Sequence, residues 1–267
     1  LCVLCGDSKR QRLCACCGLE EKRQMKIQYD DEKFFGQYAQ MSRSREGLSG
    51  AGEWHQLKKL FPDVCGKKVL DLGCGYGWHC GYAVEQGADQ VLGIDISERM
   101  IREAEKRNAD AGIIYRVCGI EEYDYPQDTW DCVISNLALH YISDLEKIYR
   151  KVYRTLKPGG TFLFNIEHPV FTAAPGQDWV RDESGTPLYW PVDDYFHAGE
   201  RKTHFLACEV TKQHHTLTQI LGGMLMCGFV LEAVEEAHPS EEMMRLPEMK
   251  DEMRRPMMLL VKARKPE

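Results

Sequence analysis

The feature that most constrains this chain is an apolar run of strand length that leads into a glycine-rich turn. Residues 69–77 read Val-Leu-Asp-Leu-Gly-Cys-Gly-Tyr-Gly, and a segment of helical character follows. Side chains on such a turn would collide with a bound ligand, so Gly73 and Gly75 let the backbone approach it, and the start of the helix offers free N–H groups. The segment predicts a ligand-binding turn at the carboxyl end of a buried strand.

A carboxylate follows the turn at the spacing that is typical of nucleoside-binding folds. The next apolar run ends in Gly-Ile-Asp at Asp95, roughly twenty residues on, where nucleoside-binding folds place an acid that accepts hydrogen bonds from ribose hydroxyls. The turn reads Gly-x-Gly-x-Gly and lacks the spacing of the dinucleotide fingerprint. Asp71 would repel a pyrophosphate but attract a ligand that carries an amino group and a sulfonium. The alternative is a turn that packs tightly and binds nothing.

Strand-length apolar runs alternate with helical segments from Lys67 onward, which is typical of βαβ units and a parallel sheet. We expect an α/β fold of the Rossmann-like, doubly wound type, with a mostly parallel seven-stranded sheet and an antiparallel strand pair at one edge. The expected strands are 67–72, 90–95, 113–117, 131–136, 161–166, 229–234 and 257–262.

Between the fourth and fifth of these strands, residues 143–156 predict an amphipathic helix, with Ser143 and Glu146 in capping-box spacing. After residue 166 the sequence shows no clear strand or helix pattern for about forty residues. We expect lid segments at about 25–60 and 168–210 to cover the carboxyl ends of the strands. The aromatic residues of the second segment could instead form a satellite cluster that anchors it.

Residues 1–24 are a cysteine-rich segment, distinct from the domain expected over residues 25–267. Five of the twelve cysteines lie in the first seventeen residues. Two Cys-x-x-Cys-Gly knuckles there have zinc-ribbon spacing, which makes weak metal-ligand candidates of Cys2, Cys5, Cys14 and Cys17. The gap between the knuckles is short for a ribbon. The competing hypothesis is a non-native extension, because residue 1 is Leu and the first methionine is Met25.

Charge and hydropathy narrow the range of partners. The formal net charge of −7 leaves no broad basic surface, which makes nucleic acid an unlikely partner. No apolar run is long enough for a membrane span, and the start lacks the pattern of a secretory signal. We therefore expect a cytoplasmic enzyme that acts on a small molecule.

Several motifs in order resemble those of class I S-adenosylmethionine-dependent methyltransferases: residues 69–77, Asp95, 136–141 and 156–160. The similarity runs from about Met25 to Lys262. Segments 50–54, 167–171 and 212–214 are also similar to a bacterial group of small-molecule-type methyltransferases, whose substrates the resemblance does not supply. The resemblance implies S-adenosylmethionine as cofactor and methyl transfer to a small-molecule acceptor by in-line displacement.

The resemblance also implies a set of cofactor-binding residues: Asp71, Gly73, Cys74, Gly75, Asp95, Ile96, Met100, Ile120, Glu121, Asn136 and Leu137. The turn would line the methionine portion, Asp71 would orient it, and Asp95 would hold the ribose diol. Ile96 and Met100 would flank adenine. Many relatives receive the adenine amino group with an Asp where this chain has Gly119, so the Ile120 backbone and Glu121 would take over that task.

Methyl transfer requires no nucleophilic side chain, but some acceptors must lose a proton. His140 is the first candidate base, because an imidazole titrates near neutral pH and because the resemblance puts its loop beside the transferable methyl group. His168 is a second candidate, and His214 is a similar case. Glu167 together with His168 could shape the acceptor pocket. For each histidine, local packing is the alternative.

Two arginines of the first lid segment, Arg43 and Arg45, could bind the cofactor carboxylate, with solvated surface as the alternative. Two other functions stay open at this point. One is a zinc-assisted RNA or protein methyltransferase, which the acidic balance disfavours. The other is an NAD-dependent oxidoreductase, which the missing third fingerprint glycine disfavours.

Overall fold

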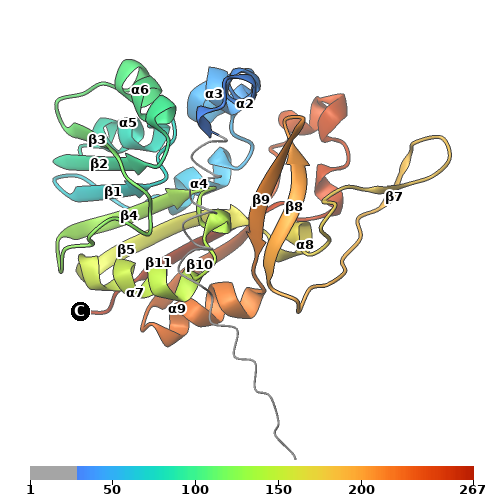
Figure 1. The fold of residues 1–267 in the computed structure, drawn as a ribbon. Helices are drawn as coiled ribbons and strands as arrows, with labels where there is room; N and C mark the ends of the chain where they lie inside the picture. Colours follow the sequence, from blue (N-terminus) through green and yellow to red (C-terminus); the bar gives the residue numbers. More distant parts are fainter. Residues whose placement is uncertain (1–28) are drawn as a thin grey trace, which may run out of the picture.

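A computed structural model describes residues 29–267. This part of the chain contains a seven-stranded sheet in the order β10-β11-β5-β4-β1-β2-β3, with helices on both faces (Figure 1). The strands are β1 (Lys68–Leu72), β2 (Gln90–Asp95), β3 (Ile113–Val117), β4 (Trp130–Asn136), β5 (Leu156–Glu167), β10 (Val230–Ala237) and β11 (Met258–Arg264). Neighbours from β3 to β5 are parallel, and β11 runs antiparallel between β5 and β10. The expected α/β fold, with antiparallel pairing at one edge, is confirmed.

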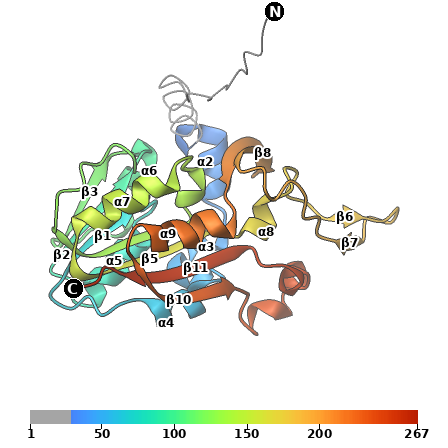
Figure 2. The same cartoon turned by 90° about the horizontal axis from the view of Figure 1, so that it is seen from below.

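Alternate side chains of each central strand enter different cores, which is why these strands are apolar throughout. In β1, Val69 packs with Cys80 and Val91 on one face, whereas Leu70 packs with Ile148 on the other. The first face is covered by α4 (Trp54–Leu60), α5 (Trp78–Glu85) and α6 (Glu98–Arg107), and the second by α7 (Leu145–Thr155), the π-helical turn η3 (Thr218–Gly222) and α9 (Gly223–Met226). Figure 2 shows α7 and α9 along that second face.

Two local predictions around α7 were wrong. The side chain of Asp144, not Ser143, caps the helix by accepting a hydrogen bond from the Lys147 amide. The N-cap therefore lies one residue later, and because the third helical position is then a lysine, no capping box forms. β5 begins at Leu156, five residues before the predicted start. A register shift against β4 accommodates the extra residues, and Gly159 turns there with a φ of 75° that favours glycine.

The segment expected to lack regular structure contains a short helix, α8 (Pro169–Thr172), and two hairpins. The hairpins are β6 (Val180–Arg181) with β7 (Pro187–Tyr189), and β8 (Gly199–Phe205) with β9 (Cys208–His214). Both make only local sheets, and most buried positions of β8 and β9 hold polar residues, so the sequence gives little apolar alternation to detect. The β6–β7 hairpin extends away from the body of the molecule (Figures 1 and 2).

Aromatic residues fasten this insertion, in agreement with the anchoring alternative. The rings of Phe171 and Trp190 stack with centroids 5.1 Å apart, and the Arg255 guanidinium lies 4.6 Å from the Trp190 centroid. Arg255 also approaches Trp179. The cluster ties the insertion to the segment before β11, which contains the short turns η4 (Met243–Arg245), η5 (Pro247–Met249) and η6 (Glu252–Arg254).

The chain before α4 crosses the carboxyl ends of the central strands as α2 (Glu32–Tyr38), α3 (Ser42–Arg45) and η1 (Gly47–Gly50). We call residues 29–53 the covering segment. The cysteine knuckles predicted at residues 1–24 lie outside the described residues. Within residues 29–267, no group of three or more histidine, cysteine, aspartate or glutamate side chains is arranged to bind a metal ion. The helices of this region are too short or too polar to traverse a bilayer.

Candidate active site

A cavity of about 260 Å³ lies where β1, β2 and β4 end. The turn after β1 forms one wall, the covering segment lies across it, and η2 (Leu139–Tyr141) with the ends of β5, β9 and β11 closes the far side. The cavity brings together most of the predicted site residues: Gly73, Cys74, Gly75, Asp95, Ile96, Met100, Ile120, Glu121, Asn136, Leu137 and His140. Asp71 and His168 are not on its wall.

The glycines of the turn have two different functions. Gly73, Gly75 and Gly77 all have positive φ angles. A Cβ on Gly73 would lie 2.4 Å from the Ala138 Cβ, so this position is glycine because of packing. A Cβ on Gly75 would meet no atom of the described residues within 4 Å. Gly75 therefore presents bare backbone to the cavity, as a ligand-binding turn requires.

Asp95 is tied directly to the turn. Its Oδ2 accepts a hydrogen bond from the Gly75 amide at 3.0 Å, and its Oδ1 accepts one from the Ser97 amide at 2.9 Å. Ser97 caps α6 as expected. Burial raises the pKa of Asp95 to about 6, although the two amide donors oppose the shift. The carboxylate lines the cavity, and each oxygen keeps a lone pair for a ligand donor.

Asp71 points away from the cavity, toward α5. Its side chain is 1% exposed, its Oδ2 accepts a hydrogen bond from the Cys80 thiol at 3.3 Å, and its Oδ1 has no partner among residues 29–267. Burial raises the pKa of Asp71 to about 7, since the thiol is a weak donor and Asp95 adds repulsion. The side chain thus contacts α5 and does not line the cavity, and the role of Asp71 in orienting the cofactor stays a prediction.

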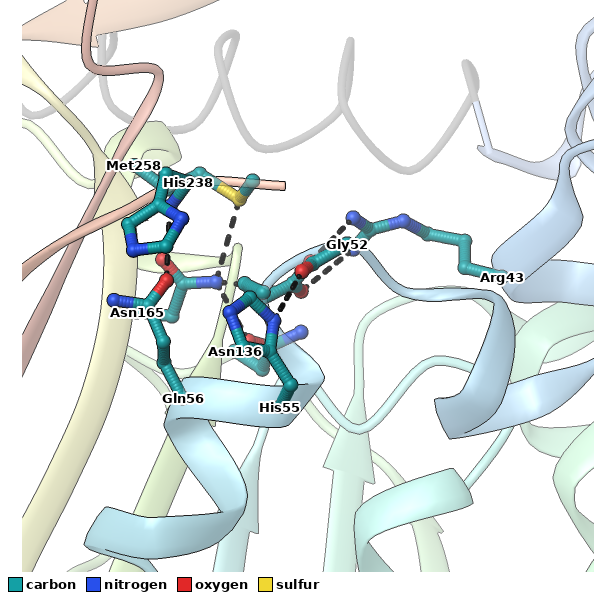
Figure 3. Close-up of polar contacts among 9 residues, drawn as sticks. Arg43, Gly52, His55, Gln56, Asn136, Asn165, His238 and Met258 are labelled. Atoms are coloured by element: carbon teal, nitrogen blue, oxygen red, sulfur yellow. Dashed lines mark hydrogen bonds and ion pairs between the residues drawn. The ribbon is translucent and has the colours of Figure 1, made fainter. Parts of the chain in front are cut away.

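A buried polar network joins the covering segment to two strand ends (Figure 3). The Arg43 guanidinium donates to both Glu53 carboxylate oxygens, at 3.2 and 3.0 Å. The Asn165 amide nitrogen lies 3.4 Å from the same carboxylate and 2.9 Å from the Asn136 side-chain oxygen. Arg43 and Asn136 line the cavity, and Arg45 does not. The fork of Arg43 is thus already engaged by the protein.

The far end of the cavity holds three ionisable side chains. The Glu167 Oε1 accepts a hydrogen bond from the Lys212 ammonium at 2.5 Å, and this ammonium lies 5.5 Å from the Phe205 ring centroid. His140 is 4% exposed. Burial lowers its pKa to about 4, although Glu167 opposes the shift. At neutral pH this end therefore contains a neutral imidazole beside an ion pair. The hydroxyls of Tyr29 and Tyr141 form a hydrogen bond of 2.9 Å nearby.

The other two candidate histidines have structural partners. The His168 Nδ1 accepts a hydrogen bond from the Val170 amide and caps α8, while its Nε2 lies 3.1 Å from a Glu236 oxygen. His214 bonds to the Thr172 hydroxyl and to a backbone carbonyl in the insertion. Both histidines thus have structural roles, and neither lines the cavity.

Sequence reasoning gave no function to Asn165 and noted Lys212 only as part of a resembling segment. A signal for Asn165 does exist, since it is a polar residue near the end of an otherwise apolar strand. It pairs in register with Asn136, which was predicted. Lys212 lies in a hairpin that the apolar pattern does not reveal, so no local signal pointed to it.

Comparison with known proteins identifies the family. Residues 70–164 match a methyltransferase domain family. A solved structure from Listeria monocytogenes, assigned to the S-adenosylmethionine-dependent methyltransferases, is 51% identical and covers 83% of this chain and all of its own (TM-score 0.79). An S-adenosylmethionine-dependent methyltransferase from Mesorhizobium loti is 42% identical, covering 82% of this chain and all of its own (TM-score 0.76). This chain belongs to the S-adenosylmethionine-dependent methyltransferases. Its cofactor is S-adenosylmethionine, and the oxidoreductase hypothesis is not supported.

A more distant relative is phosphoethanolamine N-methyltransferase 3 of Arabidopsis thaliana. It is 34% identical over 122 residues, which are 45% of this chain and 24% of the relative.

The residues of this methyltransferase cavity suit the charge of its cofactor. The two cations on the wall, Arg43 and Lys212, are each neutralised by a carboxylate, whereas Asp95 adds further negative charge. S-adenosylmethionine carries a net positive charge through its sulfonium, so an acidic cavity attracts it. The open space above Gly75 provides for close backbone contact.

Proposed function

We propose that this methyltransferase transfers the methyl group to a small-molecule acceptor, with the cofactor between Gly75 and Asp95 and the acceptor beside His140. The observation that carries the proposal is that one cavity contains both the turn tied to Asp95 and a separate polar end, where the His140 imidazole has no hydrogen-bond partner among residues 29–267. A nucleoside and a small acceptor are the two ligands that such a cavity would align.

The cofactor, when bound, supplies an electrophilic methyl carbon on a positively charged sulfur. Asp95 would accept hydrogen bonds from the ribose hydroxyls, and the Gly73–Gly75 backbone would contact the methionine portion. Ile96 and Met100 would flank adenine, with Ile120 and Glu121 at its edge. Asn136 and Leu137 would contact the methionine end. The remaining task of the chain is to align the acceptor, exclude water and accept a proton where the acceptor carries one.

The covering segment would exclude water. Tyr29, Tyr38 and Leu48 on this segment line the cavity, and the network through Glu53 attaches the segment to the strand ends. We therefore propose this segment as one lid. The second predicted lid, residues 168–210, reaches the cavity through Phe205. A cavity of about 260 Å³ between such lids favours a small acceptor over a polymer. The Arabidopsis relative is named for a small acceptor, which agrees with the proposal.

The test is binding of S-adenosylhomocysteine, measured by titration calorimetry on the full-length protein. Replacement of Asp95 by asparagine should weaken binding by about tenfold to a hundredfold, because charged hydrogen bonds contribute about 1.5–3 kcal/mol. Asp89 is exposed just before the other end of β2, so Asp89→Asn is a matched control that should leave binding unchanged. Equal affinity for all three proteins would place the ribose elsewhere.

The acceptor can then be found with a labelled methyl group. The protein is incubated with methyl-labelled S-adenosylmethionine and a bacterial metabolite extract, and the labelled products are identified. Label found only in protein or RNA would contradict a small-molecule acceptor.

A further inference from the structure

We propose that Glu167 is a positioning residue that holds the Nδ1–H group of His140, so that the His140 Nε2 serves as the base for an acceptor whose nucleophilic atom carries a proton. The proposal rests on the proposed function for its chemistry. Its structural part can be tested separately.

The fold brings the two side chains to the wall of the same cavity. His140 lies in η2, which packs against both β5 and β9. Glu167 is the last residue of β5, and Lys212 lies in β9. All three residues line the far end of the cavity, and His140 and Glu167 interact electrostatically. Residues from three separate parts of the sequence thus form one cluster, which we call the far-end cluster.

The two ring nitrogens of His140 have different surroundings. Nδ1 is sealed from solvent and has no hydrogen-bond partner among residues 29–267. Nε2 has no protein partner in that range either, but it is not sealed. Because the rest of the ring is almost fully buried and the residue lines the cavity, the exposed nitrogen is the one that reaches a ligand. An acceptor would therefore meet Nε2.

The two carboxylate oxygens of Glu167 also have different surroundings. Its Oε1 is bound by Lys212, while its Oε2 is sealed from solvent without a partner in the described residues. A buried donor or acceptor without a partner costs about 1–3 kcal/mol. A hydrogen bond from the Nδ1–H group to Oε2 would satisfy both atoms. This hydrogen bond fixes the tautomer, because a ring that carries its proton on Nδ1 has a free lone pair on Nε2.

Lys212 keeps the carboxylate in place. Its side chain is buried over the rings of Phe205 and Phe171, and its ammonium is bound to Oε1. Burial raises the pKa of Glu167, but His140 and Lys212 outweigh this and the net pKa is lowered, so the group is a carboxylate at neutral pH. Lys212 and His215 disfavour a proton on His140, whereas Glu167 favours one. Glu167 is thus the group in the cluster that stabilises the imidazolium formed during proton removal.

The acceptor X–H gives its proton to the His140 Nε2, and the electron pair of X forms a bond to the methyl carbon. The bond between that carbon and sulfur breaks, and its electron pair stays on sulfur, which becomes a neutral thioether. The positive charge passes to the imidazolium, which later releases its proton to solvent. Amines with an N–H group and hydroxyl compounds fit this step, whereas tertiary amines and thioethers have no proton to give.

The test reads the tautomer of His140 by nitrogen-15 NMR of the full-length protein labelled in histidine, at pH 7. His140→Gln identifies the signals. We expect the proton on Nδ1 in the wild-type protein. His168 is an internal reference with the opposite tautomer, because its Nδ1 accepts a hydrogen bond from the Val170 amide. A proton on Nε2 of His140 in the wild-type protein would overturn the proposal without any variant.

Two variants complete the test. Glu167→Gln should shift the His140 signals toward the Nε2–H tautomer, because Lys212 would bind the amide oxygen and the amide NH2 group, a donor, would then face Nδ1. Glu236→Gln removes the partner of His168 and should leave His140 unchanged. An unchanged His140 tautomer in Glu167→Gln would refute the positioning role. Binding of S-adenosylhomocysteine by the same samples is a separate readout: if binding fails while the tautomer is as expected, the proposed function fails and the positioning of His140 stands.

Discussion

Replacement of Asp71 by asparagine should stabilise the fold at alkaline pH. The side chain of Asp71 is sealed against α5, with a thiol as its one hydrogen-bond donor in the described residues and an unpartnered Oδ1. An ionised carboxylate there has lost its water and gained little in return. Asparagine has nearly the same shape but no charge, so it avoids this cost.

The pKa of Asp71 sets the magnitude and the pH window. Burial raises this pKa from 3.8 to about 7, and each unit corresponds to about 1.4 kcal/mol. The full penalty is therefore about 4 kcal/mol above pH 7. The folded state binds the proton more tightly than the unfolded state, so wild-type stability falls as the pH rises from about 4 to 7. We expect Asp71→Asn to gain about 2–4 kcal/mol at pH 8 and little near pH 4.

Urea denaturation at several pH values would measure this difference. Asp131→Asn is a suitable control. Burial raises the pKa of Asp131, but Lys157 and the Lys68 amide outweigh it and the net pKa is lowered. That variant should therefore be less stable than the wild type at neutral pH, and the difference should disappear in acid. If Asp71→Asn is less stable than the wild type at pH 8, the argument from burial is refuted.

Two further predictions concern the turn and the covering segment. Gly73→Ala should cost about 2–4 kcal/mol of unfolding free energy, since its Cβ would clash with a neighbouring side chain; Gly75→Ala should cost only about 1 kcal/mol but weaken S-adenosylhomocysteine binding. Melting curves and calorimetry would check both, and equal stability of the two variants would contradict the packing argument. Arg43→Ala should lower the unfolding free energy by about 2–4 kcal/mol because it leaves the buried Glu53 carboxylate unpaired, whereas Arg45→Ala, at an exposed position, should change it by less than about 0.5 kcal/mol.

The sequence was sufficient to predict the central strands and the residues at the nucleoside end of the cavity. β2 and β3 have the predicted bounds, because short apolar runs between turn residues are a local signal. Asp95 and the turn could be placed together for the same reason, since parallel strands all end at one edge of the sheet. The hairpins of the insertion were missed because their pairing is local and because most buried positions of β8 and β9 hold polar side chains.

Tertiary packing decided which side chains face the acceptor end of the cavity. Glu167 and His168 are neighbours in the sequence, yet one faces the cavity and the other caps a helix. Asp71 resembles a ligand-binding acid, but the alternation of side chains along β1 turns it toward α5.

The sequence by itself therefore determined the α/β fold, the glycine turn and the carboxylate at the end of β2, because each depends on residues close together along the chain. The tertiary structure decided which side chains surround His140, and it gave Arg43 a partner in Glu53. The physical reason is that burial, charge pairing and the pKa of a side chain depend on neighbours that folding brings from distant parts of the chain.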